Sequence, residues 1–303
     1  MNAIELEGIN KSFRAHVAVS NLSLHVPEGS IYGFIGPNGA GKTTTLRMIL
    51  NIFPPDSGSV RVLGDLRTGS RDPRISYLPE ERGLYRRMKV REVLGFFSEL
   101  RTGKVARKEI DGLLAQFELS EWADRKVETL SKGMAQKVQF IAAMIGEPRV
   151  LVLDEPFSGL DPVNMDVVRR AILDQRAKGT TIVFSTHDME KAERMCDFVC
   201  MIFRGNKVLD GTLKQIQDQH GADTLRVRVE DATIALHSLP GVQRVEDYGQ
   251  MQELVLAPGA NPQEVLSALV GRARVLKFEI ATPSLHDIFV RIAGPAAKEV
   301  NHA

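Results

Sequence analysis

The stretch that decides the fold is IYGFIGPNGAGKTTTLRMILNIF, residues 31–53. An apolar run of strand length (Ile31–Ile35) is followed by GPNGAGKTT at 36–44, which fits G-x-x-x-x-G-K-[ST], and then by a segment at 44–53 with helical periodicity. Glycines let backbone N–H groups approach phosphate oxygens closely, and the start of a helix adds the positive end of its dipole. The segment therefore predicts a phosphate-binding loop between a strand and a helix, and hence nucleotide binding.

Within this loop, two side chains carry the predicted chemistry. Lys42 places a positive charge on the β- and γ-phosphates of ATP, and the hydroxyl of Thr43 ligates Mg²⁺. Contacts to the nucleotide are expected from the whole loop, which comprises Gly36, Pro37, Asn38, Gly39, Ala40, Gly41, Lys42, Thr43 and Thr44.

A second motif, VLVLDE at residues 150–155, reads as an apolar buried strand that ends in two carboxylates. Asp154 stands where a Mg²⁺-holding carboxylate is expected, and Glu155 faces differently because strand side chains alternate. Glu155 then suits a general base that deprotonates a water attacking the γ-phosphate. An Asp-Glu pair can also simply mark the end of a strand without any catalytic role. Its occurrence in the same chain as a phosphate-binding loop favours the catalytic interpretation.

A third segment, LSKGMAQKVQF at residues 130–140, predicts a helix that begins with exposed backbone donors. Ser131 is a good N-cap, and Gly133 leaves the N–H groups of the first turn uncovered, which makes an anion site. One nucleotide needs one phosphate loop, and the chain already has one. We therefore expect this helix to contact ATP held by another copy of the fold.

The segment LSKGM resembles the signature loop of ABC-type ATPases, commonly L-S-G-G-Q. Other motifs follow the family order from residue 4 to about 215. They are Phe13, similar to the aromatic that stacks on adenine; YLPEERGLY (77–85), at the glutamine loop; SGLDP (158–162) with Asp161, similar to the loop that crosses the dimer interface; and His187, at the switch-histidine position.

This resemblance implies a P-loop NTPase fold of ABC type: an α/β domain with a mostly parallel sheet, an antiparallel β part and a helical subdomain at about 88–146. It also implies a head-to-tail dimer, of two copies or with a paralogous ATPase subunit, in which ATP lies between phosphate loop and signature.

The residues themselves indicate a mainly parallel sheet with a helical insertion. The sheet is predicted from the apolar strands at 31–36, 150–155 and 180–186, and the insertion from the helical spacing between Val90 and Ile145. We also read strands alternating with helices from Ile4 to about Asp210.

Two motifs depart from the family pattern. Lys132 and Met134 replace a glycine and a glutamine of the signature, and Glu80 replaces the glutamine of the glutamine loop. A carboxylate at Glu80 can coordinate Mg²⁺, yet it adds negative charge near the phosphates. The alternative is that Glu80–Arg82 form a solvated charged turn.

Composition excludes several classes of protein. The net charge is +1 over 303 residues, with acids and bases interleaved, so no nucleic-acid partner is expected. The apolar runs are strand-sized, and the N-terminus lacks the apolar core of a signal peptide, so we expect a cytoplasmic protein. Cys196 and Cys200 are interpreted as packed thiols, and His16 as a surface or packing residue.

The chain changes character at about residue 221, which suggests domains at 1–215 and 222–293. We predict strands at 225–229, 243–247, 253–257 and 275–281, and helices at 233–239, 262–270 and 284–292. The order βαββαβ is that of a small ferredoxin-like α+β domain.

The motifs together predict the cytoplasmic ATPase of a membrane transporter, peripheral on the inner face of the membrane and working with a separate permease. By resemblance the permease contacts the segments 77–85 and 88–97, although core packing also explains their apolar residues. PSLHDIFVRIAG at 283–294 narrows the resemblance to bacterial ATPases with a short C-terminal domain, some of them sodium or antibiotic efflux components, which favours export. The alternatives are a soluble ATPase in translation or DNA repair, and a non-hydrolytic ATP-dependent switch.

Overall fold

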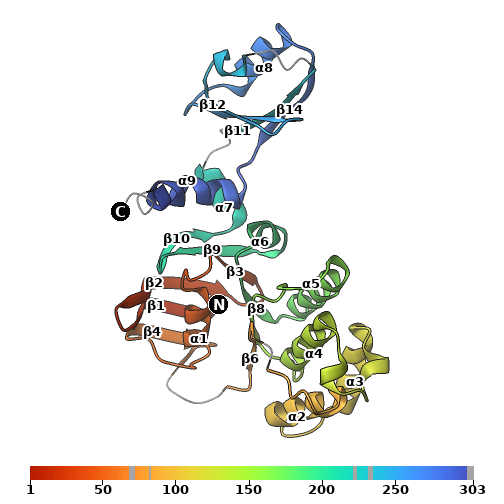
Figure 1. Ribbon diagram of the computed structural model, residues 1–303. Helices are drawn as coiled ribbons and strands as arrows, with labels where there is room; N and C mark the ends of the chain where they lie inside the picture. Colours follow the sequence, from red (N-terminus) through yellow and green to blue (C-terminus); the bar gives the residue numbers. More distant parts are fainter. Residues whose placement is uncertain (68–71, 82, 221–223, 231–234, 299–303) are drawn as a thin grey trace. The chain divides into compact units, whose positions relative to one another are not determined.

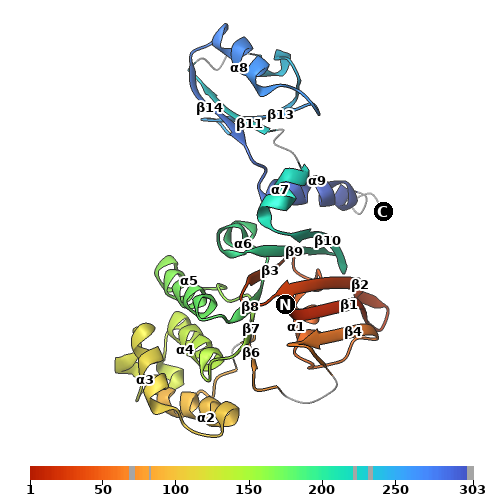
Figure 2. The same cartoon turned by 180° about the vertical axis from the view of Figure 1, so that it is seen from behind.

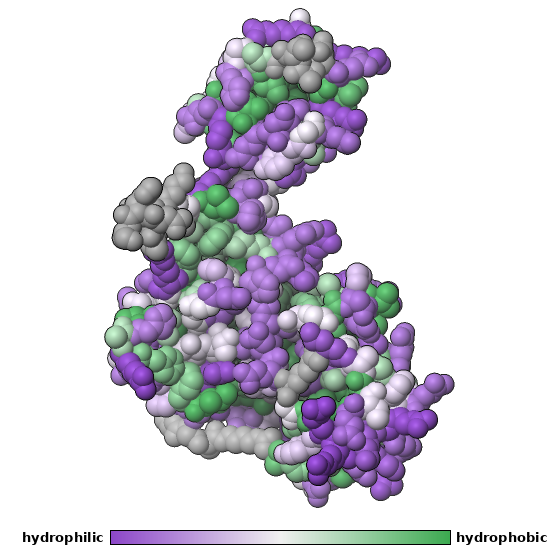
Figure 3. All heavy atoms as spheres, in the orientation of Figure 1, coloured by the Kyte–Doolittle hydropathy of each residue, from purple (hydrophilic) through white to green (hydrophobic). Residues whose placement is uncertain are grey.

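The structure is a computed structural model that describes residues 1–67, 72–81, 83–220, 224–230 and 235–298. Contacts divide the chain into two compact units, Met1–Thr212 and Leu213–Ala303. Across the described residues no helix is both long and apolar enough to cross a membrane. Polar side chains cover most of the visible surface of each unit, with apolar patches among them (Figure 3).

The N-terminal unit is built on a six-stranded sheet in the order β10-β9-β3-β8-β7-β6. All neighbouring strands in it are parallel except the pair β9 and β10. The three strands predicted from their apolar composition are all present, each one residue shorter than predicted. The strands are β3 (Ile31–Ile35), β6 (Ile75–Leu78), β7 (Val150–Asp154), β8 (Thr181–Thr186), β9 (Phe198–Phe203) and β10 (Asn206–Gly211).

A second, antiparallel sheet has the order β2-β1-β4-β5, with β1 (Asn2–Phe13), β2 (His16–Pro27), β4 (Ser57–Val62) and β5 (Asp65–Leu66). The prediction that strands alternate with helices from Ile4 onward was therefore wrong for this part. Strands β1 and β2 form a hairpin in which Phe13 lies opposite His16. A turn this short cannot accommodate a crossover helix, so the two strands run antiparallel.

Both faces of the six-stranded sheet are covered, as Figures 1 and 2 show from opposite sides. Tyr32 and Phe34 pack with helix α1 (Lys42–Ile49) and the antiparallel sheet. Leu151 and Leu153 point to the opposite face and pack with α4 (Lys132–Met144) and α5 (Pro162–Ala177). This alternation explains why the central strands are apolar at every position.

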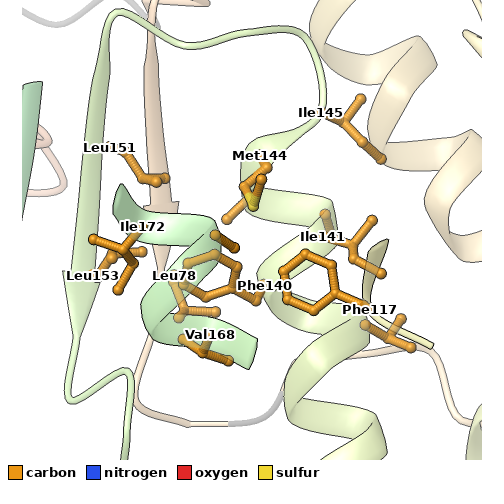
Figure 4. Close-up of a cluster of buried hydrophobic side chains, with 14 of the residues drawn as sticks. Leu78, Phe117, Phe140, Ile141, Met144, Ile145, Leu151, Leu153, Val168 and Ile172 are labelled. Atoms are coloured by element: carbon orange, nitrogen blue, oxygen red, sulfur yellow. The ribbon is translucent and has the colours of Figure 1, made fainter. Parts of the chain in front are cut away.

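The predicted helical insertion consists of α2 (Val90–Thr102), α3 (Arg107–Gln116), two 3₁₀ turns at Ser120–Trp122 and Val127–Thr129, and α4. Its core joins that of the sheet, because Phe140 of α4 lies in one cluster with Leu151 and Leu153 of β7. Within the insertion, Phe140 packs against Phe117 with ring centroids 5.7 Å apart (Figure 4). Arg101 of α2 closes the end of α4, because its guanidinium donates to Ala143 O (2.9 Å) and Ile145 O (2.6 Å). The same group donates to Ser76 Oγ of β6 at 2.6 Å, which fastens the helices to the sheet.

Two cysteines lie along this sheet. Cys200 in β9 is completely buried, and Cys196 follows α6 (Met189–Met195), where a Cβ added to Gly33 would lie 2.5 Å from its Sγ. Both are free thiols, and burial raises the pKa of each.

The C-terminal unit contains a four-stranded antiparallel sheet in the order β12-β13-β11-β14, which is the order expected for βαββαβ. Its elements are α7 (Leu213–His220), β11 (Thr224–Val229), β12 (Val242–Asp247), β13 (Gln252–Leu256), α8 (Pro262–Val270), β14 (Val275–Ala281) and α9 (Leu285–Lys298).

One predicted helix of this unit, at 233–239, is not an α-helix in the described residues. Residues 233 and 234 lie outside the described part, and only a 3₁₀ turn at Leu236–Ser238 follows. The turn ends at Leu239, which is extended with ψ 148° and precedes Pro240. A residue before proline disfavours the helical region, so the segment stops there.

Candidate nucleotide site

The loop at 36–41 connects β3 to α1 and fits only glycine at two positions. Gly36 has φ +148°, and a Cβ there would lie 2.1 Å from Ile202 O. Gly41 has φ +109°, and a Cβ there would lie 2.3 Å from Ala18 O. No side chain fits at either end of the loop, because the backbone there lies against the carbonyl groups of Ile202 and Ala18. The helix begins at Lys42, directly after the loop, so its free N–H groups start there.

Lys42 is buried against this loop. Its Nζ donates to Gly36 O at 2.8 Å and to Pro37 O at 3.0 Å. Burial lowers the pKa of Lys42, while the negative charges of Glu155, Asp154 and Glu80 act in the opposite direction. An ammonium group held among carboxylates next to the loop is well placed to take up phosphate oxygens.

The hydroxyl of Thr43 and the carboxylate of Asp154 lie side by side, with Thr43 Oγ1 donating to Asp154 Oδ1 at 3.1 Å. Asp154, at the end of β7, is only 1% exposed and also accepts hydrogen bonds from Ser185 Oγ and from Tyr77 OH (3.4 Å). Hydroxyl and carboxylate oxygens are ligands that suit Mg²⁺, which usually takes one or two carboxylates together with phosphate and water. The residues present therefore fit this ion.

Glu155 and His187 form a second pair. Glu155 has φ +48° and is 9% exposed; its N–H donates to both the carbonyl (3.2 Å) and the Oγ (3.1 Å) of Ser185. Its Oε1 accepts the His187 N–H at 3.1 Å and lies 2.8 Å from His187 Nδ1. A carboxylate held by a backbone donor and an imidazole has the orientation that a general base requires.

A pocket of about 480 Å³ brings these groups together with the phosphate loop. Phe13 lines this pocket with 46% of its surface exposed. Its ring packs edge-on against the ring of Phe53, with the ring centroids 5.6 Å apart. The lining residues are Phe13, His16, Ala18, Asn38, Gly39, Ala40, Gly41, Lys42, Thr43, Thr44, Glu80, Glu155, Ser158 and His187. Of the Glu80–Arg82 turn, Arg82 lies outside the described residues.

Comparison with known proteins identifies the family. Residues 19–158 match the "ABC transporter" family model, and residues 211–293 match the "ATP-binding protein DrrA1-3-like, C-terminal domain" model. The chain is 38% identical over 293 residues to the uncharacterized ABC transporter ATP-binding protein YhaQ of Bacillus subtilis, which covers 96% of this chain and 98% of that protein. It belongs to the ABC transporter ATP-binding proteins.

Two further similarities agree with this assignment. The Nod factor export ATP-binding protein I of Rhizobium sp. (strain N33) is 35% identical over 300 residues, covering 96% of this chain and 97% of that protein. A solved structure of an ATP binding subunit of an ABC transporter superposes with a TM-score of 0.65 at 29% identity, covering 72% of this chain and 93% of that one. The fold is thus that of the ABC ATPases, and ATP binding follows from the family.

The ABC signature residues do not line this pocket. Ser131 is exposed and caps α4 by accepting the Met134 N–H at 3.2 Å, as predicted for an N-cap. Gly133 lies beside Asn164 of α5, since a Cβ there would be 3.1 Å from Asn164 Nδ2. Asp161 caps α5 and accepts the Asn164 N–H at 3.0 Å; this backbone hydrogen bond leads the interactions that lower the pKa of Asp161. Asn164 therefore contacts both Gly133 and Asp161, neither of which lines the pocket.

Sequence reasoning did not select several residues of the site. Ser185 contacts both Asp154 and Glu155, yet it is an ordinary serine within a buried strand. Tyr77 was placed only in the glutamine-loop segment, His16 was interpreted as a surface or packing residue, and Ser158 was seen only as part of SGLDP. The parallel pairing of Asp154 with Ser185 in β7 and β8 is the signal that could have identified Ser185.

Proposed function

We propose that this ABC ATP-binding subunit hydrolyses ATP and thereby drives export through a separate permease. The observation that supports it is the pocket that gathers Lys42, Thr43 and the Glu155–His187 pair around one phosphate loop, with Asp154 hydrogen-bonded to Thr43. These are the components that phosphoryl transfer requires: a phosphate cradle, a metal-holding carboxylate and a group that activates water.

In the proposed reaction, Glu155 accepts a proton from the water that attacks the γ-phosphorus, and the bond to the β–γ bridging oxygen breaks to give ADP and phosphate. His187 orients Glu155 through the 2.8 Å contact and lies on the same pocket. Lys42 and the loop N–H groups stabilise the charge on the transferred phosphoryl group. A bound Mg²⁺ would add neutralisation of the β- and γ-oxygens, and Thr43 and Asp154, together with Glu80 on the pocket wall, would hold it.

The position of the signature residues supports a head-to-tail dimer, of two copies or with a paralogous ATPase subunit. Ser131 and Asp161 are exposed, and Val163, two residues beyond Asp161, is 72% exposed. An exposed helix start with free N–H groups binds anions. We propose that it binds the γ-phosphate of ATP carried by the other subunit.

A groove of about 600 Å³ between the sheet and the helical block is the proposed permease site. It is lined by residues of both predicted contact segments, Tyr77, Pro79, Gly83, Leu84 and Phe97 among them. Phe96, beside the groove in α2, is 40% exposed, whereas Val93 and Leu94 of the same helix are buried core residues. The segment 88–97 thus serves both core packing and an accessible apolar face.

Coupling between this groove and the nucleotide has a physical route. Gln139 of α4 lines the groove, and its Nε2 donates to Glu81 O at 3.0 Å and to Pro79 O at 3.4 Å. These two residues flank Glu80, which lines the nucleotide pocket. Movement of the helical block is therefore expected to move Glu80.

Export and location are the parts of the proposal that rest on relatives. Several relatives carry names for Nod factor export, which supports the outward direction. A motor of this kind works on the cytoplasmic face of the membrane, bound to its permease.

The catalytic part is tested with Glu155→Gln. We expect this variant to bind ATP with the affinity of the natural protein while phosphate release falls by about 10²–10⁴-fold, the usual contribution of a general base. Glu81→Gln is the matched control, because it makes the same change beside the pocket, on a residue that does not line it. Undiminished hydrolysis by Glu155→Gln would overturn the base assignment.

The transport part needs a separate experiment. The protein is tagged, membranes are extracted in mild detergent, and co-purifying proteins are identified. A multi-span membrane protein in stoichiometric amount supports the motor function, whereas recovery with ribosomes or soluble partners alone would contradict it and leave the ATPase chemistry intact.

A further inference from the structure

Lys11 of β1 contacts an aromatic pair beside the nucleotide pocket without lining the pocket itself. Its ammonium group lies over the rings of Phe13 and Phe53, 5.7 Å and 5.4 Å from their centroids, which is within the range of a cation–π interaction. The same Nζ donates to Pro54 O at 3.0 Å and to Asp56 Oδ1 at 2.7 Å. Because only 13% of the Lys11 side chain is exposed, these contacts hold its charge in one place.

Asp56 connects this lysine to the backbone of β1. Its Oδ2 accepts the Ser12 N–H at 2.7 Å, and its own N–H donates to Asn10 O at 2.8 Å. The hydrogen bond from Lys11, followed by that from Ser12, lowers the pKa of Asp56, so the carboxylate is charged at neutral pH. Asp56 therefore fastens the segment that follows α1 to the last residues of β1.

Phe13 is the member of the aromatic pair that lines the nucleotide pocket, together with the phosphate loop. It is the last residue of β1, and nearly half of its ring surface is exposed. A base that stacks on an aromatic ring gains about 1–3 kcal/mol. A ring already held in the binding orientation keeps more of this gain, because less side-chain freedom is lost when the ligand binds.

We propose that Lys11 and Asp56 are positioning residues for the base of the nucleotide, which hold Phe13 in the orientation that receives the base without contacting the nucleotide themselves. Helix α1, which has eight residues, begins at the phosphate loop and leads to Phe53 and Asp56. One short segment, residues 36–56, therefore carries both the phosphate loop and the residues that restrain Phe13. The distance between phosphates and base is thereby matched to the bound nucleotide.

The test compares ADP with inorganic pyrophosphate, which carries two linked phosphates without adenosine. Each ligand is titrated against the full-length chain as a competitor of fluorescent ADP. Lys11→Met should weaken ADP binding at least about fivefold, which corresponds to about 1 kcal/mol of stacking, and should leave pyrophosphate binding unchanged. Neither ligand requires hydrolysis or a permease, so the result is independent of the proposed function.

Lys207→Met is the matched control. Lys207 Nζ also donates to one carbonyl and one carboxylate, Ser23 O at 2.6 Å and Asp210 Oδ2 at 2.8 Å, and Lys207 does not line the pocket. The control variant should bind ADP like the natural chain. An equal loss of ADP affinity in both variants would mean that any buried lysine contact matters in this way, and would contradict the proposal.

Phe13→Leu shows whether Lys11 acts through the ring. This variant alone should weaken ADP binding at least about tenfold. In its background Lys11→Met should add less than about twofold, because no ring is left to hold. Additive losses would overturn the proposal.

Asp56→Asn supplies a second variant that does not depend on the folding of Lys11→Met. The amide keeps the size of the side chain and weakens its bond to Lys11, so ADP binding should fall while pyrophosphate binding stays unchanged. Unchanged ADP binding in both Lys11→Met and Asp56→Asn, or a parallel loss of ADP and pyrophosphate binding, would overturn the positioning role.

Discussion

The hydroxyl of Tyr77 lies 3.4 Å from Oδ2 of Asp154, so one side chain connects the groove beside the helical block with the carboxylate of the nucleotide site. The other oxygen of Asp154 is occupied by Thr43 and Ser185. Tyr77 therefore completes the set of donors that orients this carboxylate, and it does so from the wall of the proposed permease site.

Tyr77→Phe should weaken the use of Mg²⁺ without weakening nucleotide binding as such. Removing the hydroxyl leaves Oδ2 of Asp154 without this donor, and the long 3.4 Å bond implies a modest effect. We expect the Mg²⁺ concentration for half-maximal binding of fluorescent ATP to rise by about threefold, with metal-free binding unchanged. Tyr85→Phe, on an exposed ring away from Asp154, is the control. An unaltered Mg²⁺ titration would show that Tyr77 does not position the carboxylate.

The raised pKa of Tyr77 predicts that the folded state loses stability at alkaline pH. Burial, followed by the charge of Asp154, raises the pKa of Tyr77 from 10.0 to about 12. The folded state therefore keeps the phenol proton where the unfolded chain loses it, so this contribution is complete below pH 10 and is lost as the pH rises to 12. Chemical unfolding at pH 9 to 12 should show a steeper decline for the natural chain than for Tyr77→Phe. Parallel curves would contradict the predicted linkage.

Ser131→Ala separates helix capping from the proposed contact with a second subunit. Loss of the cap on α4 should lower the free energy of unfolding by about 1 kcal/mol. If Ser131 also contacts ATP of the other subunit, ATP hydrolysis should fall at least about tenfold. Asn261→Ala is the matched control, because Asn261 caps α8 through the Gln263 N–H. It should show a similar loss of stability with full hydrolysis; equal activity of both variants would remove Ser131 from the site.

Phe140→Ala should destabilise the N-terminal unit by about 3–5 kcal/mol, because the ring is completely buried between the helical block and the sheet. Urea unfolding followed by circular dichroism measures this. Phe96→Ala removes the same ring from an exposed position and should cost far less. Comparable losses would mean that Phe140 is not a core residue.

The central strands and the phosphate loop could be predicted because their physical requirements are local. Buried parallel strands must be apolar at nearly every position, as in β7, and the loop admits only glycine at Gly36 and Gly41. The observed strand order of the C-terminal sheet agrees with the predicted ferredoxin-like arrangement, although its first helix is only a 3₁₀ turn in the described residues.

Other features depend on distant partners and left no local signal. Ser185 becomes important only because β8 pairs with β7 and brings its hydroxyl to Asp154. The antiparallel β part was expected only from the family resemblance, because the pairing of β1 with β4 joins strands that β2, β3 and α1 separate in sequence. The 3₁₀ turn at Leu236–Ser238 differs from these cases, because Pro240 is a local signal: the residue before a proline disfavours the helical region.

Cys200 is completely buried and Cys196 is partly buried, so the natural thiols are expected to react slowly. With the pKa of both thiols raised, little thiolate forms at neutral pH, and alkylating reagents find few nucleophiles. A single cysteine introduced on an exposed helix would then be the main reactive thiol in the molecule. Fluorescent or nitroxide labels could report the motion of one chosen element without prior removal of the natural cysteines.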